Sequence, residues 1–169
     1  TRTDAPLFWD VVPSTQVRMV GNNCQKRAEI TQNLFMPSAL DSVVFSGVTA
    51  TLAPNKVLSI TTPPVRLQNS NFIGADTTQQ HEGVYLAGQK ALVNQSSFKH
   101  GVVGLKNTMP GGQVAFSISN CTFTHNTTGY MQHGGQLLAE QCTARYNTTG
   151  LLIEAATNSI SINGGIYAH

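Results

Sequence analysis

The chain contains short segments that resemble one another at a spacing of roughly 21 to 26 residues. Each segment has alternating apolar and polar residues, a central Asn, Gln or Glu-Gln, and a last apolar position. The four closest copies are Val65–Phe72, Ala91–Phe98, Phe116–Phe123 and Leu137–Ala144. Looser copies lie at Phe45–Val48 and Ile160–Ile166, and we align Val48 with Phe72 and Ile166 with Ala144. A repeat of this length is typical of solenoids, in which every copy forms one coil.

Each copy predicts two short strands joined by a bend, followed by a third strand. Asn suits the bend because it tolerates the left-handed backbone region, and we place it there at Asn69, Asn120 and Asn163. A Gly opens the third strand; this Gly is Gly83, Gly104, Gly129 or Gly150. Such short strands need the same strand of the next coil as a partner, which predicts a parallel β-helix. The alternative, a helical solenoid, lacks the 3.6-residue apolar period.

These repeats resemble the right-handed parallel β-helix repeat of pectate lyases, polygalacturonases and bacteriophage tailspikes. The resemblance covers roughly residues 40 to 169 and consists of the repeat pattern alone. It implies an all-β, right-handed, single-stranded parallel β-helix of about six to seven coils. Residues 1–40 do not follow the repeat clearly, and we expect an N-terminal cap or connecting segment there, with coils over 41–169. The start lacks an initiator Met, so we expect a piece of a longer protein.

Composition limits the classes of partner. Of the 169 residues, 40% are hydrophobic and 11% are charged, with a formal net charge of +2. Lys26-Arg27 is the only dense basic spot, so we expect no nucleic-acid partner. No apolar run approaches 18 residues, so we expect no membrane span. Cys121 and Cys142 share one repeat position and should be small buried residues, not a disulfide.

The repeat also predicts which side chains point outward on the Gly-led strands. We expect Val84, Leu86, Leu105, Tyr130, Leu151 and Ile153 to point inward. The outward column is then Tyr85, Lys106, Met131 and Leu152. Three of these four are apolar or aromatic, which indicates a glycan-contact or subunit-contact face. The alternative is a register shifted by one residue.

Two sets of residues could supply acid–base chemistry on a polysaccharide. Glycoside hydrolysis needs two carboxylates, whereas elimination needs a base and a cation near a uronate. The loop Ile73–Glu82 carries Asp76, His81 and Glu82, and such loops often hold function. His133 and Glu154 each lie four residues after their Gly and should be neighbours. The competing interpretations are an ordinary polar loop and a solvent-facing charge pair.

A third set, His100, His125 and Tyr146, should form a column of rings at a corner. It could contact sugar rings, or it could only rigidify the corner. Asn94, Asn120, Asn126 and Asn147 begin N-glycosylation motifs. Asn126 and Asn147 share one repeat position, so we expect structural hydrogen bonds there and no glycan. The cysteines should point inward while the histidines sit elsewhere, so we expect no metal site and no cofactor.

These observations lead to one function and two alternatives. We expect a virion surface or tail-associated protein, similar to tailspikes, that forms a rigid oligomer and contacts host-surface polysaccharide. The resemblance implies a homotrimer, other virion proteins as partners, and a virion or extracellular location. The first alternative is a polysaccharide lyase or glycoside hydrolase of the pectinase-like class. The second is a purely structural virion decoration or fibre module.

Overall fold

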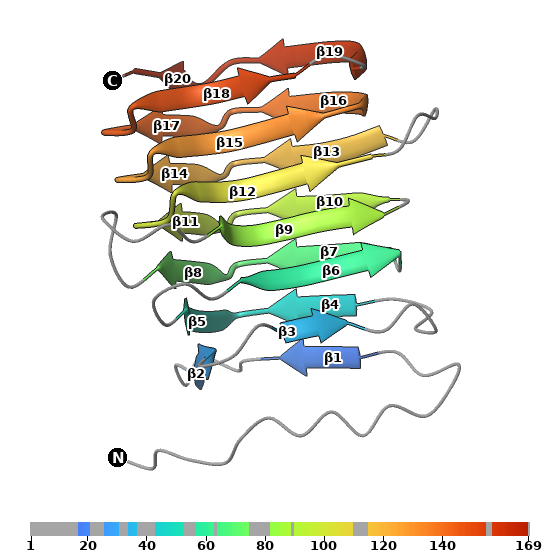
Figure 1. Ribbon diagram of the computed structural model, residues 1–169, viewed down its shortest axis with the longest axis vertical. Helices are drawn as coiled ribbons and strands as arrows, with labels where there is room; N and C mark the ends of the chain where they lie inside the picture. The colour runs from blue at the N-terminus through green and yellow to red at the C-terminus, as the bar shows by residue number, and fades with distance from the viewer. Residues whose placement is uncertain are drawn as a thin grey trace.

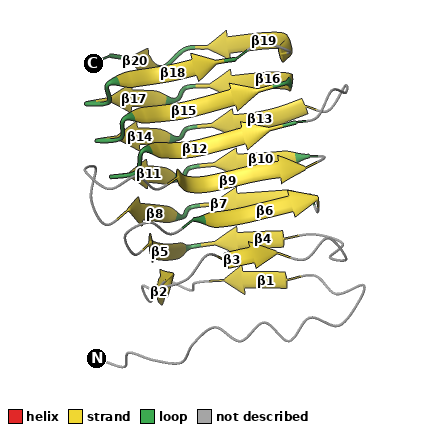
Figure 2. Ribbon diagram, viewed as in Figure 1, coloured by secondary structure: helices red, strands yellow, loops and turns green. Residues whose placement is uncertain are grey.

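The computed structural model describes residues 17–20, 26–30, 34–36, 43–52, 57–62, 64–74, 82–88, 90–109, 115–154 and 157–168. Side chains are described from Val43 onward. The described residues form strands, turns and bends and contain no helix (Figure 2).

The strands form three parallel sheets, named A, B and C here. Sheet A contains β1 (Val17–Val20), β4 (Val43–Ser46), β7 (Val65–Gln68), β10 (Ala91–Asn94), β13 (Ala115–Ser119), β16 (Gly135–Glu140) and β19 (Thr157–Asn163). Sheet B contains β2 (Lys26–Ile30), β5 (Val48–Leu52), β8 (Asn71–Gly74), β11 (Ser97–Lys99), β14 (Thr122–Thr124), β17 (Thr143–Arg145) and β20 (Ile166–Tyr167). Sheet C contains β3 (Leu34–Met36), β6 (Leu58–Thr62), β9 (Glu82–Gly88), β12 (Val103–Thr108), β15 (Thr128–His133) and β18 (Thr149–Ile153).

The chain visits sheets A, B and C in turn, and each visit pairs with the strand one coil earlier. In Figure 1, β12 crosses the front from left to right and β13 returns behind it, while the chain climbs from the N-terminus to the C-terminus. This path is a right-handed coil, the hand that twisted parallel strands favour. The described strands make six coils of three, and β19 and β20 begin a seventh. The predicted right-handed parallel β-helix is therefore confirmed. Strands β1 to β3, which lie within residues 1–40, belong to the same three sheets.

Apolar side chains in register fill the interior. Phe72, Phe98 and Phe123 pair directly, and their rings stack at 5.2 and 5.3 Å between centroids. Val93, Leu105 and Ile118 are also fully or almost fully buried. Because a side chain points inward at every second strand position, one strand alone contributes only two or three core residues. The core therefore exists only where several coils stack, which is why the fold is a solenoid.

The corner between sheets A and B is a single residue in the left-handed region. It is Gly47, Asn69, Gln95, Asn120, Gln141 or Gly164, with φ between 48° and 65°. Asn69 and Asn120 were predicted at this bend. Asn163 was predicted there too, but that assignment is wrong, because Asn163 pairs with Glu140 inside β19 and Gly164 makes the turn.

Two alignments in the looser repeats were also wrong. Ala50, not Val48, pairs with Phe72, and the backbone of Val48 donates a hydrogen bond to Ser70 Oγ at 3.3 Å. Tyr167, not Ile166, pairs with Ala144. In both cases a large aliphatic residue was taken for the end of a copy. Val48 instead follows the corner directly, where later coils have Ser or Cys, and Ile166 sits at an outward position.

Candidate functional site

The outer face of sheet C carries the predicted column. Lys106 pairs with Tyr85 and Met131, and Met131 pairs with Leu152, so the four side chains form one row along the solenoid. Each is partly exposed. The Lys106 ammonium lies 5.6 Å from the centre of the Tyr85 ring, a cation–π distance. Neighbouring side chains in this row cover one another, which accounts for part of their burial.

His133 and Glu154 meet at the end of the same face. Their strands β15 and β18 are paired, and His133 Nδ1 lies 2.8 Å from Glu154 Oε2. The side chains are 45% and 40% exposed, so water reaches both. Thr108 pairs with His133 on the other side. A carboxylate that holds one imidazole nitrogen leaves the other free to exchange a proton with a ligand.

His100, His125 and Tyr146 stack along the corner between sheets B and C, and we call them the ring ladder. The centroid distances are 5.3 Å between His100 and His125 and 5.1 Å between His125 and Tyr146. All three residues have φ of 57°, in the left-handed region. Tyr146 is 65% exposed. The backbone of a bulky residue costs about 1–2 kcal/mol in this region, so the rings occupy an unfavourable place.

A row of basic residues runs beside the ring ladder on the outer face of sheet B. Lys99 pairs with Thr124, and Thr124 pairs with Arg145, so the two cations are two coils apart. Lys99 is partly exposed and Arg145 is exposed. The sequence gives this row no motif, and we did not predict it. The spacing of Lys99 and Arg145 from their corner rings was the only available signal.

Behind the ring ladder, two buried Asn side chains hold the corner. Asn126 and Asn147 are 3% and 4% exposed. Asn147 Oδ1 accepts from the Asn126 backbone at 2.9 Å, and Asn147 Nδ2 donates to the Phe123 carbonyl at 2.9 Å. Asn126 repeats the pattern with Gly101 and Phe98. The predicted hydrogen-bonded stack is confirmed, and it leaves neither amide accessible to a glycosyltransferase in the folded protein.

The Gly residues that open the sheet C strands lie where side chains do not fit. A Cβ on Gly104 would lie 2.7 Å from the Gly129 carbonyl oxygen, and one on Gly129 would lie 2.6 Å from that of Gly150. On Gly150 the nearest heavy atom would be Ala144 Cβ, at 3.4 Å. The close approach of consecutive coils therefore explains the Gly at these strand starts.

The interior of sheet C contains a polar cluster that the sequence analysis missed. Gln132 Oε1 accepts from Asn107 Nδ2 at 3.0 Å and from the Tyr130 hydroxyl. All three residues are buried, and burial raises the pKa of Tyr130 well above its ordinary value, with the nearby Cys142 adding to the shift. Asn107 was overlooked because it takes the inward position that Leu86 occupies one coil earlier.

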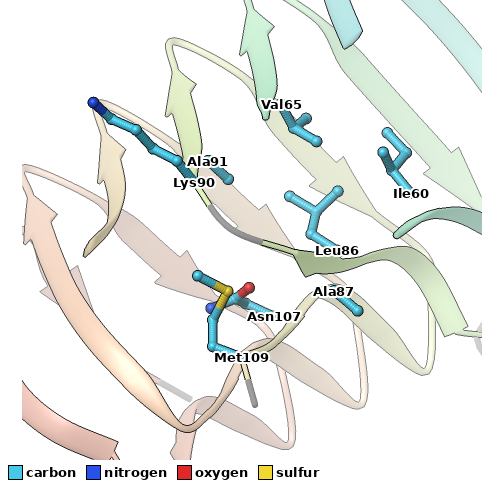
Figure 3. Close-up of a pocket in the computed structure, with 8 residues that line it drawn as sticks. All are labelled: Ile60, Val65, Leu86, Ala87, Lys90, Ala91, Asn107 and Met109. Carbon is cyan, nitrogen blue, oxygen red and sulfur yellow. The ribbon is translucent and has the colours of Figure 1, made fainter. Parts of the chain in front are cut away.

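A small cavity of about 10 Å³ lies beside Asn107, where sheet C turns toward sheet A. Figure 3 shows the lining side chains, with Lys90 extending away from the others. The lining residues are Ile60, Val65, Leu86, Ala87, Lys90, Ala91, Asn107 and Met109. Asn107 Oδ1 has no hydrogen-bond partner among the described residues. The volume fits about one water molecule, so this cavity is not a substrate site.

Cys121 and Cys142 are free thiols and buried, as predicted. Each thiol donates to the carbonyl two residues earlier, Ser119 at 3.2 Å and Glu140 at 3.4 Å. Ser70 and Ser96 make the same contact in earlier coils. The hydrogen bond from Cys121 lowers the pKa of Cys142 to about 7, while their interaction and burial raise that of Cys121. This column is part of the core.

The loop predicted to hold a catalytic pair is mostly outside the described residues. Asp76 and His81 lie outside them, and of Glu82 only the backbone, at the start of β9, is described. Their arrangement as a site stays a prediction.

No family model matches this chain, and searches of curated proteins and solved structures find no significant similarity. Among the described side chains, no group of three or more His, Cys, Asp or Glu could hold a metal ion. Within the same residues, no helix is long and apolar enough to cross a membrane. The evidence for function is therefore the surface of the solenoid itself.

Proposed function

We propose that this β-solenoid is a rigid virion surface or tail-associated component, similar to a tailspike, that contacts host glycan. The observation that supports the proposal is the ring ladder. Three rings occupy left-handed positions where Asn or Gly would be easier to place, and they stand exposed in one row along a rigid axis. Sugars bind to such surfaces through ring contacts and through hydrogen bonds to their hydroxyls.

A rigid row of equivalent positions suits a repeating ligand. Each coil offers a similar set of groups, so successive sugar units can bind neighbouring coils. Several weak contacts on one chain then give useful avidity without a deep pocket. A β-solenoid supplies the required rigidity because its strands are hydrogen-bonded from coil to coil.

Glycan binding tests the proposal directly. The purified protein is screened against capsular polysaccharides and lipopolysaccharides immobilised on an array. The triple variant His100→Asn, His125→Asn, Tyr146→Asn removes the rings while keeping a residue that tolerates the left-handed region. We expect the variant to lose binding. The double variant Arg66→Gln, Lys90→Gln changes two exposed residues away from the ring ladder and should bind like the wild type. Retained binding by the ring variant would place the glycan elsewhere.

Assembly is the second part of the proposal. Tailspike-like proteins are trimers, and the outer face of sheet C, with Tyr85, Met131 and Leu152, is a suitable subunit contact. Sedimentation equilibrium at micromolar concentration should give the mass of three chains, and Met131→Glu should shift it to one. A wild-type monomer would remove the role of this face. Labelling of intact virions with an antibody to the protein tests its location.

One observation favours an alternative, a polysaccharide lyase or hydrolase. The contact of 2.8 Å between His133 and Glu154 gives an oriented imidazole that could abstract a proton. Lys106 lies on the same face and could neutralise a uronate carboxylate. If this function is correct, the protein shortens one of the glycans on the array, and His133→Asn abolishes cleavage while Glu140→Gln does not. Intact glycan with the wild type would exclude this alternative for the glycans tested.

A further inference from the structure

We infer that the glycan bound at the corner between sheets B and C is acidic and lies along the solenoid axis. The contacts would be Lys99, Arg145 and the ring ladder, which together we call the corner strip. The inference rests on the proposed glycan contact and adds the charge of the glycan, its location and its direction.

The charge follows from the residues on this part of the surface. Lys99 and Arg145 point outward from sheet B in a single column, on either side of Thr124. Each directly precedes a residue of the ring ladder. The acidic side chains that the structure describes, Glu140 and Glu154, lie elsewhere, at the end of β16 in sheet A and just after β18 in sheet C. The described part of the strip therefore presents positive charge toward a ligand.

The rings add hydrogen-bond donors of a defined spacing. The faces of His125 are covered by its two neighbours, so a ligand meets the exposed ring edges, with imidazole N–H and phenol O–H groups. The corners between sheets A and B reach the same left-handed region with Asn, Gln or Gly. The backbone therefore does not require rings at the corner strip. A ligand that uses ring edges gives them a purpose beyond shape.

The direction follows from the coil spacing. Parallel strands are about 4.8 Å apart, so Lys99 and Arg145 are separated by about 10 Å along the axis. A pyranose unit is about as long as one coil spacing. A polysaccharide with a carboxylate on alternate sugars would therefore meet both cations. Its intervening hydroxyls would face the ring edges.

Binding measurements with matched glycans test this inference. Dextran and carboxymethyl-dextran share a backbone and differ in charge, alginate supplies a natural uronate chain, and single-stranded DNA supplies a different polyanion. We expect the wild type to bind carboxymethyl-dextran and alginate, more weakly as salt is added. Lys99→Gln with Arg145→Gln should weaken binding about tenfold, since two exposed charge contacts are lost. The control Arg66→Gln with Lys90→Gln removes the same net charge elsewhere and should have little effect.

The outcomes separate this inference from the proposed function. Binding of neutral glycans on the array with no response to Lys99→Gln and Arg145→Gln would overturn the acidic ligand and leave the glycan contact standing. An equal loss in the control variant would overturn the location. Equal affinity for single-stranded DNA would show a general polyanion surface and overturn the choice of glycan. Failure to bind any glycan, neutral or acidic, would overturn both proposals.

Discussion

His133 Nδ1 and Glu154 Oε2 lie 2.8 Å apart across the paired strands β15 and β18, in contact with water on both sides. Because the two side chains are 45% and 40% exposed, their interaction should contribute little to folding. We expect a double-mutant cycle with His133→Asn and Glu154→Gln to give a coupling energy below about 1 kcal/mol. Urea denaturation measures it. A coupling above about 2 kcal/mol would mean that the pair supports the fold rather than a surface function.

Gly104 and Gly150 occupy equivalent positions but should respond differently to Ala. The new Cβ in Gly104→Ala would lie 2.7 Å from a carbonyl oxygen and 3.0 Å from Asn126 Nδ2, so adjacent coils must separate. We expect a loss of about 1–3 kcal/mol in the free energy of unfolding. Gly150→Ala meets only ordinary contacts and should be neutral or stabilising, by up to about 1 kcal/mol. Equal losses in the two variants would contradict the close approach as the cause.

Asn147→Ala should destabilise the corner beneath the ring ladder. It leaves the Asn126 backbone N–H and the Phe123 carbonyl without their partner, and both are buried. We expect a loss of about 2–4 kcal/mol by urea denaturation. The control is Thr148→Ala, at an exposed neighbour.

The burial of Asn126 and Asn147 also predicts a result in a glycosylating host. Mass spectrometry of the secreted, folded protein should show both asparagines unmodified. A glycan on either one would mean that the corner is open when the transferase acts.

Tyr130 should make the fold sensitive to alkaline pH. Its pKa is raised in the folded state, so its contribution is complete below about pH 10, the value for an unfolded chain, and is lost as pH rises further. The loss is at most about 1.4 kcal/mol per pH unit. We expect Tyr130→Phe to reduce this slope in urea titrations between pH 9 and pH 11. Tyr167 keeps its own raised pKa of about 12 in both proteins.

The same variant has a neutral-pH cost and a control. Tyr130→Phe should lose about 1 kcal/mol at pH 7, and no more, because Gln132 Oε1 keeps its hydrogen bond from Asn107. Tyr146→Phe, at an exposed ring, should leave the alkaline slope unchanged. An unchanged slope in Tyr130→Phe would assign the alkaline sensitivity to other groups.

Asn107→Leu should stabilise the protein. Asn107 Oδ1 is buried without a described partner, and Leu86 already fills the same position one coil earlier. The exchange removes the isolated acceptor and costs one hydrogen bond, while Gln132 Oε1 retains the Tyr130 hydroxyl. We expect a gain of about 1 kcal/mol in the free energy of unfolding. A loss larger than that would show that a bound water satisfies Oδ1 well.

The strict repeats carried most of the information about the fold. Phe72, Phe98 and Phe123 recur at nearly constant spacing, and each must find the same neighbour, so the register of the middle coils followed from the sequence. At the ends of the repeat the guide failed. Val48 and Ile166 are aliphatic residues beside a corner Gly, and alternation alone does not say on which side of the turn an apolar residue falls.

The surface was only partly predictable. The contact of His133 with Glu154 followed from counting residues after each Gly, because equal counts give equal places on neighbouring coils. Lys99 and Arg145 were missed because a lone basic residue has no pattern until its coil neighbours are known. Asn107 was missed because an inward polar residue breaks the alternation on which the assignment of faces depends.

The single-residue corners between sheets A and B make one coil a unit of length. Gln95 and Asn120 have φ of 48° and 52°, and each is followed by a residue whose side chain donates to the carbonyl two positions earlier. Removing residues 96–120 would join Gln95 to Cys121 with the local geometry of both corners unchanged. Insertions and deletions of whole coils therefore preserve every ladder, whereas any other length shifts one. The molecule can evolve as a ruler graduated in coils.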